Sequence, residues 1–304
     1  QDRVGGNLDG VAAALADAHG QDMTAVRRFW KMSGSGNDFV VFDSRGTASE
    51  PLEEPSTIRA LSARGTGVGA DGVVFVTSAK QPGAAVAMRY YNADGSRATF
   101  CGNATLCVTR LAHDLGLSLS GSLALETDSG VISTRMSLAG PEIELPAATE
   151  VVADAPLAMA AGERRIGFAL AGVPHVVVLC EDVEAVELGV RGAELRHAPW
   201  RPEGANANFV SRHDGEWLMR TFERGVEGET LACGTGAIAT AILLATWNEA
   251  GRTTTLRTRS GRPLRVQLRR TGAEWHPTLS GEGRIVFEGE LGEWAVGSDA
   301  MQIV

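Results

Sequence analysis

Two short cysteine motifs hold the side chains best suited to chemistry in this sequence. Residues 101–104 read Cys-Gly-Asn-Ala, and residues 233–236 read Cys-Gly-Thr-Gly. Each motif is followed by a small, apolar run that suits a helix, over residues 105–115 and 237–246. A cysteine at a helix start lies beside unpaired backbone N–H groups, which favour anions and lower the pKa of a thiol. The spacing therefore predicts two thiols, each at the N-terminus of a helix.

Two such helix starts that face each other would form a pocket with a thiol on either side. Backbone donors at residues 102–103 and 234–235 could hold a carboxylate as negative charge builds on it. One thiolate can act as a base and one thiol as an acid, and positioned groups of this kind contribute about 10²–10⁴-fold each. This arrangement suits proton exchange at the α-carbon of an amino acid. We therefore predict that Cys101 and Cys233 are a catalytic pair whose roles swap with the direction of reaction.

The cysteines could instead serve as metal ligands, as the nucleophile of a hydrolase or as structural residues. A metal site from Cys101, Cys107, Cys233 and His175 would need four converging ligands, and no Cys-x-x-Cys spacing supports it. A cysteine hydrolase using His175 would leave the pairing of the two Cys-Gly motifs unexplained. Both motif cysteines could also be structural. Cys107 and Cys180 are interpreted as small buried hydrophobic residues.

Composition limits the class of protein. The chain has 304 residues, enough for two domains, with 44% hydrophobic and 21% charged residues. Its formal charge of −9 argues against a nucleic-acid or anionic-membrane partner. No apolar run approaches the ~20 residues that span a bilayer, and residues 11–16 are too short for a signal peptide. Four cysteines make no disulfide framework, so we expect reduced thiols in the cytoplasm.

The order of elements is repeated along the chain. Short strand-like runs, one glycine-led apolar helix and further strand-like runs occur twice, which indicates a duplication. The strands lie too close together for parallel crossovers, so mostly antiparallel pairing is expected. The predicted fold class is α+β, with two pseudo-symmetric lobes, each an antiparallel β-barrel-like sheet around a central helix. Shorter helices are expected over residues 56–64 and 186–191. Residues 146–156, rich in Ala and Pro, mark the predicted boundary between lobes.

The two cysteine motifs resemble those of the diaminopimelate epimerase family, whose members use one cysteine base and one cysteine acid without pyridoxal. Four further stretches carry the resemblance, which extends from residue 29 to the end: residues 31–39, 69–72, 172–175 and 206–210. The resemblance implies lobes over residues 29–147 and 148–283, with 284–304 crossing back to the first. Residues 1–28 are then an N-terminal extension, to which we assign no function.

This resemblance also implies an activity and a site. The expected reaction is epimerisation of L,L- to meso-diaminopimelate, serving lysine and cell-wall precursor supply, with no cofactor or metal, in a homodimer. Cys101 would take the proton from the L,L centre and Cys233 from the meso centre, with His175 as a supporting neighbour. The expected substrate contacts are Asn37, Asn92, Gly102, Asn103, Asn206, Glu223, Arg224, Gly234 and Thr235.

Several of these contacts have assigned roles in the family. The residue matching Arg224 binds the distal carboxylate of the substrate, as a guanidinium can do with two parallel hydrogen bonds. The residue matching Glu223 contacts the ammonium end, and those matching Asn92 and Asn206 bind the distal amino-acid group. Structural alternatives stay open: a turn asparagine at position 37, an internal ion pair of Glu223 with Arg224, and a satisfied core group at position 175.

The sequence departs from the family pattern near the first cysteine. The family usually has Cys-Gly-Asn-Gly-x-Arg-Cys, whereas this chain has Ala104, Thr105 and Leu106 before the next cysteine. Val173 replaces the Asn often found before the Pro-His pair, and Gly72 stands where some members have Gln. The reacting groups are retained while the specificity contacts change. A related racemase or epimerase for another amino acid is therefore the main alternative, and a catalytically silent ligand-binding member is the second.

Overall fold

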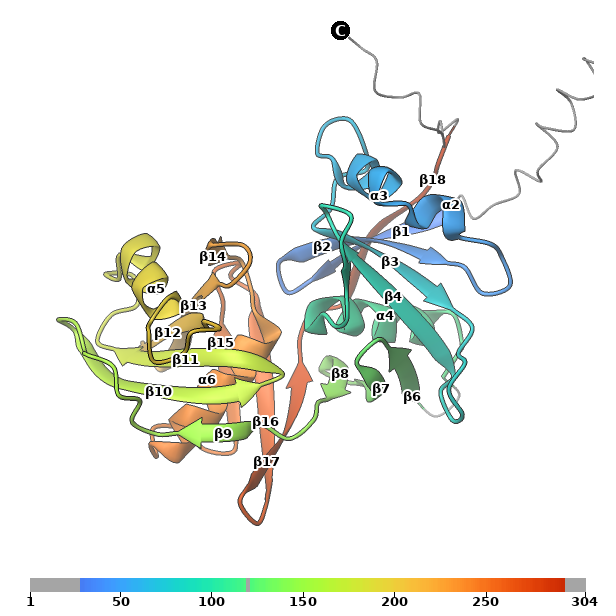
Figure 1. The fold of residues 1–304 in the computed structure, drawn as a ribbon. Coiled ribbons are helices and arrows are strands. Elements are labelled where there is room, and N and C mark those ends of the chain that lie inside the picture. The colour runs from blue at the N-terminus through green and yellow to red at the C-terminus, as the bar shows by residue number, and fades with distance from the viewer. Residues whose placement is uncertain (1–27, 119–120, 293–304) are drawn as a thin grey trace, which may run out of the picture.

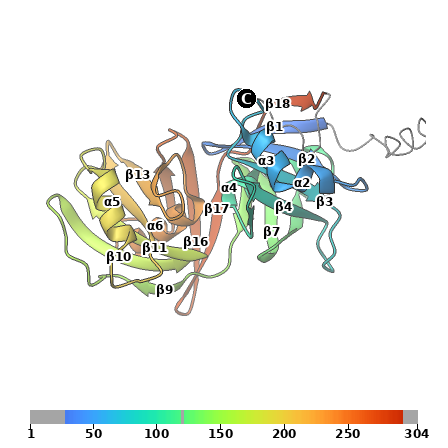
Figure 2. The same ribbon diagram turned by 45° about the horizontal axis from the view of Figure 1, so that its top comes forward.

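The computed structural model describes residues 28–118 and 121–292, which form a sheet-dominated α+β fold of two lobes (Figures 1 and 2). The predicted fold class is confirmed. The predicted extension over residues 1–28 lies outside the described residues apart from Arg28, as do residues 293–304.

The strands of the first lobe are β1 (Arg28–Gly34), β2 (Asn37–Asp43), β3 (Gly72–Thr77), β4 (Val86–Asn92), β5 (Arg97–Ala98), β6 (Ser122–Thr127), β7 (Gly130–Ser137) and β8 (Gly140–Glu144). Those that follow are β9 (Thr149–Val152), β10 (Glu163–Ala171), β11 (Val173–Cys180), β12 (Asn206–His213), β13 (Glu216–Glu223), β14 (Gly228–Thr230), β15 (Thr253–Arg257), β16 (Pro263–Thr271), β17 (Glu274–Ser280) and β18 (Arg284–Glu290). The helices are α2 (Glu50–Glu53), α3 (Pro55–Ser62), α4 (Gly102–Asp114), α5 (Leu188–Arg196) and α6 (Gly234–Thr246).

Both lobes follow one pairing plan. In the first, β1–β2 is antiparallel, β2–β3 parallel, β3–β4 and β4–β5 antiparallel, β4–β6 parallel, and β6–β7–β8 antiparallel. In the second, β10 to β17 repeat that order, with β11–β12 and β13–β15 as the parallel pairs. The match strand by strand supports an internal duplication.

The parallel pairs correct one expectation. The sequence spacing suggested that no parallel crossovers fit, but each of these four pairs is bridged by helical chain. Helices α2 and α3 connect β2 to β3, α4 connects β4 to β6, α5 connects β11 to β12, and α6 connects β13 to β15. The predicted helices are themselves the crossovers that parallel neighbours require. The other pairs between these strands of the described residues are antiparallel, so the expectation of mostly antiparallel pairing is confirmed.

Two strand pairs join distant parts of the chain. Strand β17 pairs antiparallel with β8, which connects the sheets of the two lobes, and β18 pairs antiparallel with β1. Strand β9, which pairs with β10, lies in residues 146–156, where we expected no regular element. Its four residues show no clear alternation, which is why the pattern missed it. The residue-level division at 147 and 148, with 284–304 in the first lobe, stays a prediction.

Helices α4 and α6 form the cores of the two lobes, and the prediction of two buried helices is confirmed. Helix α6 is apolar on nearly every side, and Ile238, Ile242 and Leu243 are almost fully buried. Helix α4 buries Leu106, Val108 and Leu111 in the same way. Each buried side chain of this size contributes about 1.5–3 kcal/mol. Such burial fixes the axis of each helix, and with it the position of its first turn.

The two shorter predicted helices are also present, as α3 and α5, although α5 ends at Arg196, five residues later than predicted. Among the described residues, no helix has the length and apolarity needed to cross a bilayer.

Candidate active site

The two motif cysteines occupy equivalent places. Cys101 immediately precedes α4, and Cys233 immediately precedes α6, so each is the N-cap of a core helix. The backbone N–H of Gly236 donates to the Cys233 sulfur at 3.4 Å, and the Thr235 hydroxyl lies 3.6 Å from that sulfur. The two helices contact each other. The predicted placement of both thiols at helix starts is therefore confirmed.

The thiol pKa values differ from the sequence-based expectation. Burial raises the pKa of Cys101 to about 11 and that of Cys233 to about 12. The backbone N–H groups of the helix starts do favour the thiolates, but they are outweighed by burial. The carboxylate of Glu223 raises both pKa values further, since a nearby negative charge disfavours a second one. The expectation of a lowered thiol pKa is wrong for the ligand-free protein, and one carboxylate acts on both sulfurs.

One apolar side chain lies against the starts of both helices. Leu279, on β17, lies against both Gly102 and Gly234. A Cβ atom added at Gly234 would come within 2.9 Å of the Leu279 side chain, whereas one at Gly102 would stay at 3.6 Å. The strand that links the lobes therefore also contributes a side chain that touches both helix starts.

The glycine-rich turn at residues 34–36 is a packing element. A Cβ at Gly34 would come within 2.6 Å of the Asn103 carbonyl oxygen. Gly36 has a φ of +115°, a conformation that favours glycine, and it lies against Ser260 of the second lobe. The Ser260 hydroxyl donates to the Ser35 carbonyl oxygen at 2.8 Å. This turn brings the first strand pair against α4 and against the opposite lobe.

A chain of amides leads from this turn to the first helix start. Asn37 donates from Nδ2 to an Asp71 carboxylate oxygen at 3.1 Å, and its Oδ1 accepts from Asn103 Nδ2 at 2.7 Å. Asn103 Oδ1 is buried and has no hydrogen-bond partner among the described residues. That oxygen would lie 3.8 Å from a Cβ at Gly234 in the other lobe. Asn37 and Asn103 are thus brought together by a side-chain hydrogen bond, and the role of Asn37 in binding substrate stays a prediction.

The distal-site candidates of the second lobe also lie together. Asn206 Oδ1 accepts from the backbone N–H of Arg224 at 2.7 Å. The Arg224 guanidinium donates to the Glu203 carbonyl oxygen at 3.2 Å, and the described residues include no salt bridge to Arg224. The alternative of an internal ion pair with Glu223 is therefore wrong. A guanidinium without a carboxylate partner is suited to bind one from a ligand.

Asn92 is less closely tied to the other candidates. Its side chain donates to the Ser96 hydroxyl at 3.0 Å, within the turn that follows β4. No hydrogen bond in the described part of the chain connects it to either cysteine. The structure therefore places Asn92 at the end of a first-lobe strand, and its contact with the distal group of a substrate stays a prediction.

His175 is fully buried on β11 beside the second helix start. Asn208 Nδ2 lies 3.1 Å from His175 Nδ1, and Nε2 has no partner among the described residues. Burial and then the positive charge of Arg224 lower the pKa of His175 to about 3, so the ring is neutral. No hydrogen bond joins His175 to Cys101 or Cys233 in the described residues. The cysteine–histidine pair that the hydrolase alternative requires is therefore not formed.

Three residues of the site were not found from the sequence. Tyr90 forms a hydrogen bond with Cys101 that lowers the pKa of that thiol, Asp71 fixes Asn37, and Asn208 contacts His175. A signal existed for two of them, because alternate residues of a strand share a face. Tyr90 lies two residues before Asn92, and Asn208 two residues after Asn206. Asp71 lies in residues 69–72, a stretch that carries the family resemblance but from which no site residue was named.

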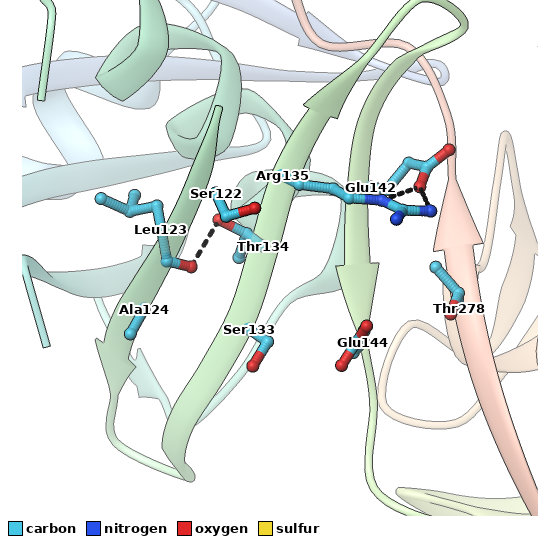
Figure 3. A pocket seen from close by; sticks show the side chains of 9 residues that line it. All are labelled: Ser122, Leu123, Ala124, Ser133, Thr134, Arg135, Glu142, Glu144 and Thr278. Atoms are coloured by element: carbon cyan, nitrogen blue, oxygen red, sulfur yellow. Dashed lines mark hydrogen bonds and ion pairs between the residues drawn. The ribbon is translucent and has the colours of Figure 1, made fainter. Parts of the chain in front are cut away.

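The surface pocket shown in Figure 3 lies elsewhere. It is formed by β6, β7, β8 and β17, and Arg135 pairs across it with Glu142 at 2.5 Å. Neither cysteine lines it. Its polar groups pair locally, as when the Thr134 hydroxyl donates to the Leu123 carbonyl oxygen at 3.2 Å. The two motif cysteines stand instead at the starts of the contacting helices α4 and α6, and the candidate site is placed there. Within residues 28–118 and 121–292, no cluster of three or more His, Cys, Asp or Glu side chains could hold a metal ion.

Several solved structures share this architecture. The phenazine biosynthesis protein of the PhzF family from Bacillus anthracis has a TM-score of 0.66 at 16% identity, covering 88% of this chain and 99% of its own. A hydroxyproline epimerase from Agrobacterium vitis has a TM-score of 0.63 at 18% identity, covering 88% and 93%. At these identities the likeness shows the shared fold alone.

Sequence comparison gives a closer relationship. Residues 29–148 and 168–284 match the family described as "Diaminopimelate epimerase". A protein of that name from Gemmatimonas aurantiaca is 49% identical over 274 residues, covering 86% of this chain and 98% of its own. Another, from Aquifex aeolicus, is 36% identical over 275 residues, covering 87% and 98%. With both cysteine motifs at equivalent helix starts and a match over most of its length, the chain belongs to the diaminopimelate epimerase family.

Proposed function

We propose that this protein epimerises L,L-diaminopimelate to meso-diaminopimelate without a cofactor, by moving one α-proton between Cys101 and Cys233. The relatives named as diaminopimelate epimerases support the substrate. One observation carries the mechanism: two free thiols stand at equivalent starts of two contacting core helices, and the charge of Glu223 acts on both. Two-base proton exchange at one carbon requires a thiol on either side of that carbon, and this arrangement supports such a pair.

In the proposed reaction, the substrate carboxylate binds to the backbone N–H groups of the two helix starts. The thiolate of one cysteine takes the α-proton, so a C–H bond breaks and an S–H bond forms. The carbanion is stabilised by the donors around its carboxylate. The thiol of the other cysteine then returns a proton to the opposite face and becomes the thiolate. We assign removal of the proton of the L,L centre to Cys101 and of the meso centre to Cys233.

The raised thiol pKa values suggest how the thiolate forms. Glu223 lies close enough to both sulfurs to raise both pKa values, and burial raises the pKa of its own carboxyl group. A substrate ammonium that pairs with Glu223 would cancel its charge and bring a positive charge near the thiols. Both changes favour a thiolate. The substrate itself would therefore help to produce the base that attacks it.

The distal end of the substrate is assigned to the second lobe. The Arg224 guanidinium, which has no carboxylate partner among the described residues, would take the distal carboxylate, with Asn206 holding the Arg224 backbone in place. Asn92 would complete this end from the first lobe. Because Val173 and Leu106 stand where family members usually have polar side chains, a different amino acid is the alternative substrate.

Deuterium exchange separates these possibilities. L,L-Diaminopimelate incubated with the protein in D₂O should gain deuterium at one α-carbon, as read by mass spectrometry. The variants Cys101→Ser and Cys233→Ser should each lose epimerisation by more than about 10²-fold. Exchange in another amino acid but not in diaminopimelate would establish the alternative substrate. Turnover retained in either variant would reject the two-base mechanism, and a pyridoxal scavenger should leave the rate unchanged.

The same proposal includes the cellular setting. All four cysteines in the described residues are free, as expected for thiols that function in the reducing cytoplasm. The family resemblance supports a homodimer, which light scattering would detect as twice the 31.9 kDa chain mass. A mass equal to that of one chain would contradict the dimer.

A further inference from the structure

The contacts of Asn208 determine which nitrogen of His175 carries the proton. Asn208 Nδ2 donates to the Val176 carbonyl oxygen at 3.0 Å and lies 3.1 Å from His175 Nδ1. A carbonyl oxygen can only accept, so the atom facing it must be the NH₂ group of the amide. On the other side, Asn208 Oδ1 accepts from the Thr221 hydroxyl at 3.0 Å. The orientation of the Asn208 amide is therefore fixed from both ends.

This orientation leaves His175 Nδ1 with one role. It faces an NH₂ group, which has no lone pair to offer, so Nδ1 must accept a hydrogen bond. In a neutral imidazole the proton then sits on Nε2. Burial keeps the ring neutral, and Nε2 is a buried donor without a partner among the described residues. A buried unpaired donor costs about 1–3 kcal/mol, so it marks a position where a ligand acceptor is expected.

His175 lies close to the start of α6. Helix α6 packs on β11, which carries His175, and on β12, which carries Asn208. A Cβ added at Gly236 would overlap Oδ1 of the Asn208 side chain and lie 3.2 Å from the Cys233 sulfur. Asn208 thus touches the first turn of the helix that begins at Cys233. The ligand groups that reach a helix start are anions, and both thiols are protonated in the ligand-free state.

We propose that Asn208 is a positioning residue that holds His175 as the neutral Nε2–H tautomer, so that Nε2–H donates a hydrogen bond to the carboxylate of the bound amino acid. In this arrangement His175 is a hydrogen-bond donor and takes no proton from a thiol or from the substrate. The assignment of the acceptor rests on the proposed function, whereas the tautomer follows from the protein alone.

The tautomer can be read directly in the ligand-free protein. In ¹⁵N-histidine-labelled protein, the protonated and unprotonated ring nitrogens resonate far apart, and comparison with His175→Gln assigns the signals among the six histidines. Wild type should show Nε2 protonated and Nδ1 unprotonated at neutral pH. Saturating meso-diaminopimelate should shift the Nε2–H resonance. The diamine 1,5-diaminopentane, which has no carboxylate, should leave it in place.

Two variants test the role of the amide. Asn208→Asp replaces the donor facing Nδ1 by an acceptor, so the proton should move to Nδ1 or the ring should become charged. Deuterium exchange in the substrate should then fall by about 10²–10³-fold, the usual cost of losing one preorganised donor. Thr221→Val is the matched control: it removes a contact of the same amide but leaves Val176 to orient it. That variant should keep the Nε2–H tautomer and an exchange rate close to that of wild type.

The outcomes are distinct. An Nδ1–H tautomer or an imidazolium at His175 in wild type would overturn the proposal. So would an Nε2–H resonance that does not shift at saturating meso-diaminopimelate, although the same protein exchanges the α-proton of that substrate. Full activity in a folded Asn208→Asp variant would overturn it too. If wild type shows the Nε2–H tautomer but exchanges no α-proton of diaminopimelate, the proposed epimerase activity is rejected. The role of Asn208 in holding the tautomer would still stand.

Discussion

Cys101 and Cys233 adopt nearly the same backbone conformation, with φ −145° and ψ 115° at Cys101 and φ −133° and ψ 109° at Cys233. Each is followed by a helix of 13 residues that its lobe buries. Because the two lobes repeat one topology, equivalent elements place the two thiols at the starts of two helices that contact each other. A duplicated fold is a direct way to place two like groups on opposite faces of one carbon.

The first prediction concerns the thiols of the ligand-free protein. The rate of alkylation of each thiol should rise with pH as the thiolate forms. The pKa read from this rise should be about 11 for Cys101 and about 12 for Cys233, above the 9.0 of an unperturbed thiol. Glu223→Gln should move both profiles to lower pH, because removing a negative charge favours the thiolate. Mass spectrometry of peptides alkylated over a range of pH measures each cysteine separately. Glu229→Gln, which removes a carboxylate paired with Arg220, is the control and should change neither profile.

A second prediction tests the close contact at the start of α6. Gly236→Ala should displace the Asn208 amide and lower the free energy of unfolding by about 1–3 kcal/mol, as overpacking does, with a loss of substrate exchange. The first lobe offers a matched position, since Ala104 occupies the same place after Cys101 and is fully buried. Ala104→Gly should cost at most about 1 kcal/mol, from helix propensity alone. Denaturant unfolding and the deuterium assay measure both effects, and equal behaviour of the two variants would contradict this account.

The third prediction concerns Arg224. Arg224→Gln should reduce kcat/KM for diaminopimelate by about 10–100-fold, since hydrogen bonds to charged groups contribute about 1.5–3 kcal/mol. Exchange in L-lysine, which lacks the distal carboxylate, should be weak in wild type and unaffected by the substitution. Arg220→Gln, on the preceding strand, removes a guanidinium that already pairs with Glu229 and should leave KM unchanged. An equal loss for both substrates would show that Arg224 does not bind the distal carboxylate.

A fourth prediction concerns stability in acid. Although burial opposes it, hydrogen bonds from Arg64 and Lys31 lower the pKa of Asp38 to about 2, from an ordinary 3.8. A depressed carboxyl pKa gives stability that is present above pH 3.8 and is lost as the pH falls toward 2. Asp38→Asn should therefore cost about 2 kcal/mol at neutral pH and progressively less in acid. Denaturant unfolding from pH 7 to 3 tests this.

The control for that experiment is a more exposed ion pair. Asp128→Asn removes the partner of Arg97, whose side chain is 46% exposed, and should change the free energy of unfolding by less than about 1 kcal/mol. If Asp38→Asn and Asp128→Asn had the same small effect, the network around Asp38 would not contribute to stability.

Local sequence signals determined the parts of the fold that depend on neighbours along the chain. The apolar runs after Cys101 and Cys233 indicated both core helices, and the cysteine-glycine pairs marked where they begin. Glycine turns and alternating apolar residues located most strands. The duplication was visible because the same local order occurs twice. The amino-acid types alone also pointed to an acid–base pair of thiols.

Tertiary structure decided what depends on residues far apart in the sequence. The parallel pairing of β11 with β12 could not be read from spacing, and it is this pairing that sets His175 beside the segment carrying Asn208. The thiol pKa values rose instead of falling, because burial is imposed by both lobes together and exceeds the local effect of the helix start. The sequence by itself thus indicated the pair of thiols proposed to react and the helix ends at which they stand. Their protonation states and partners were decided only when the two lobes came together, since desolvation and hydrogen-bond geometry are properties of the assembled core.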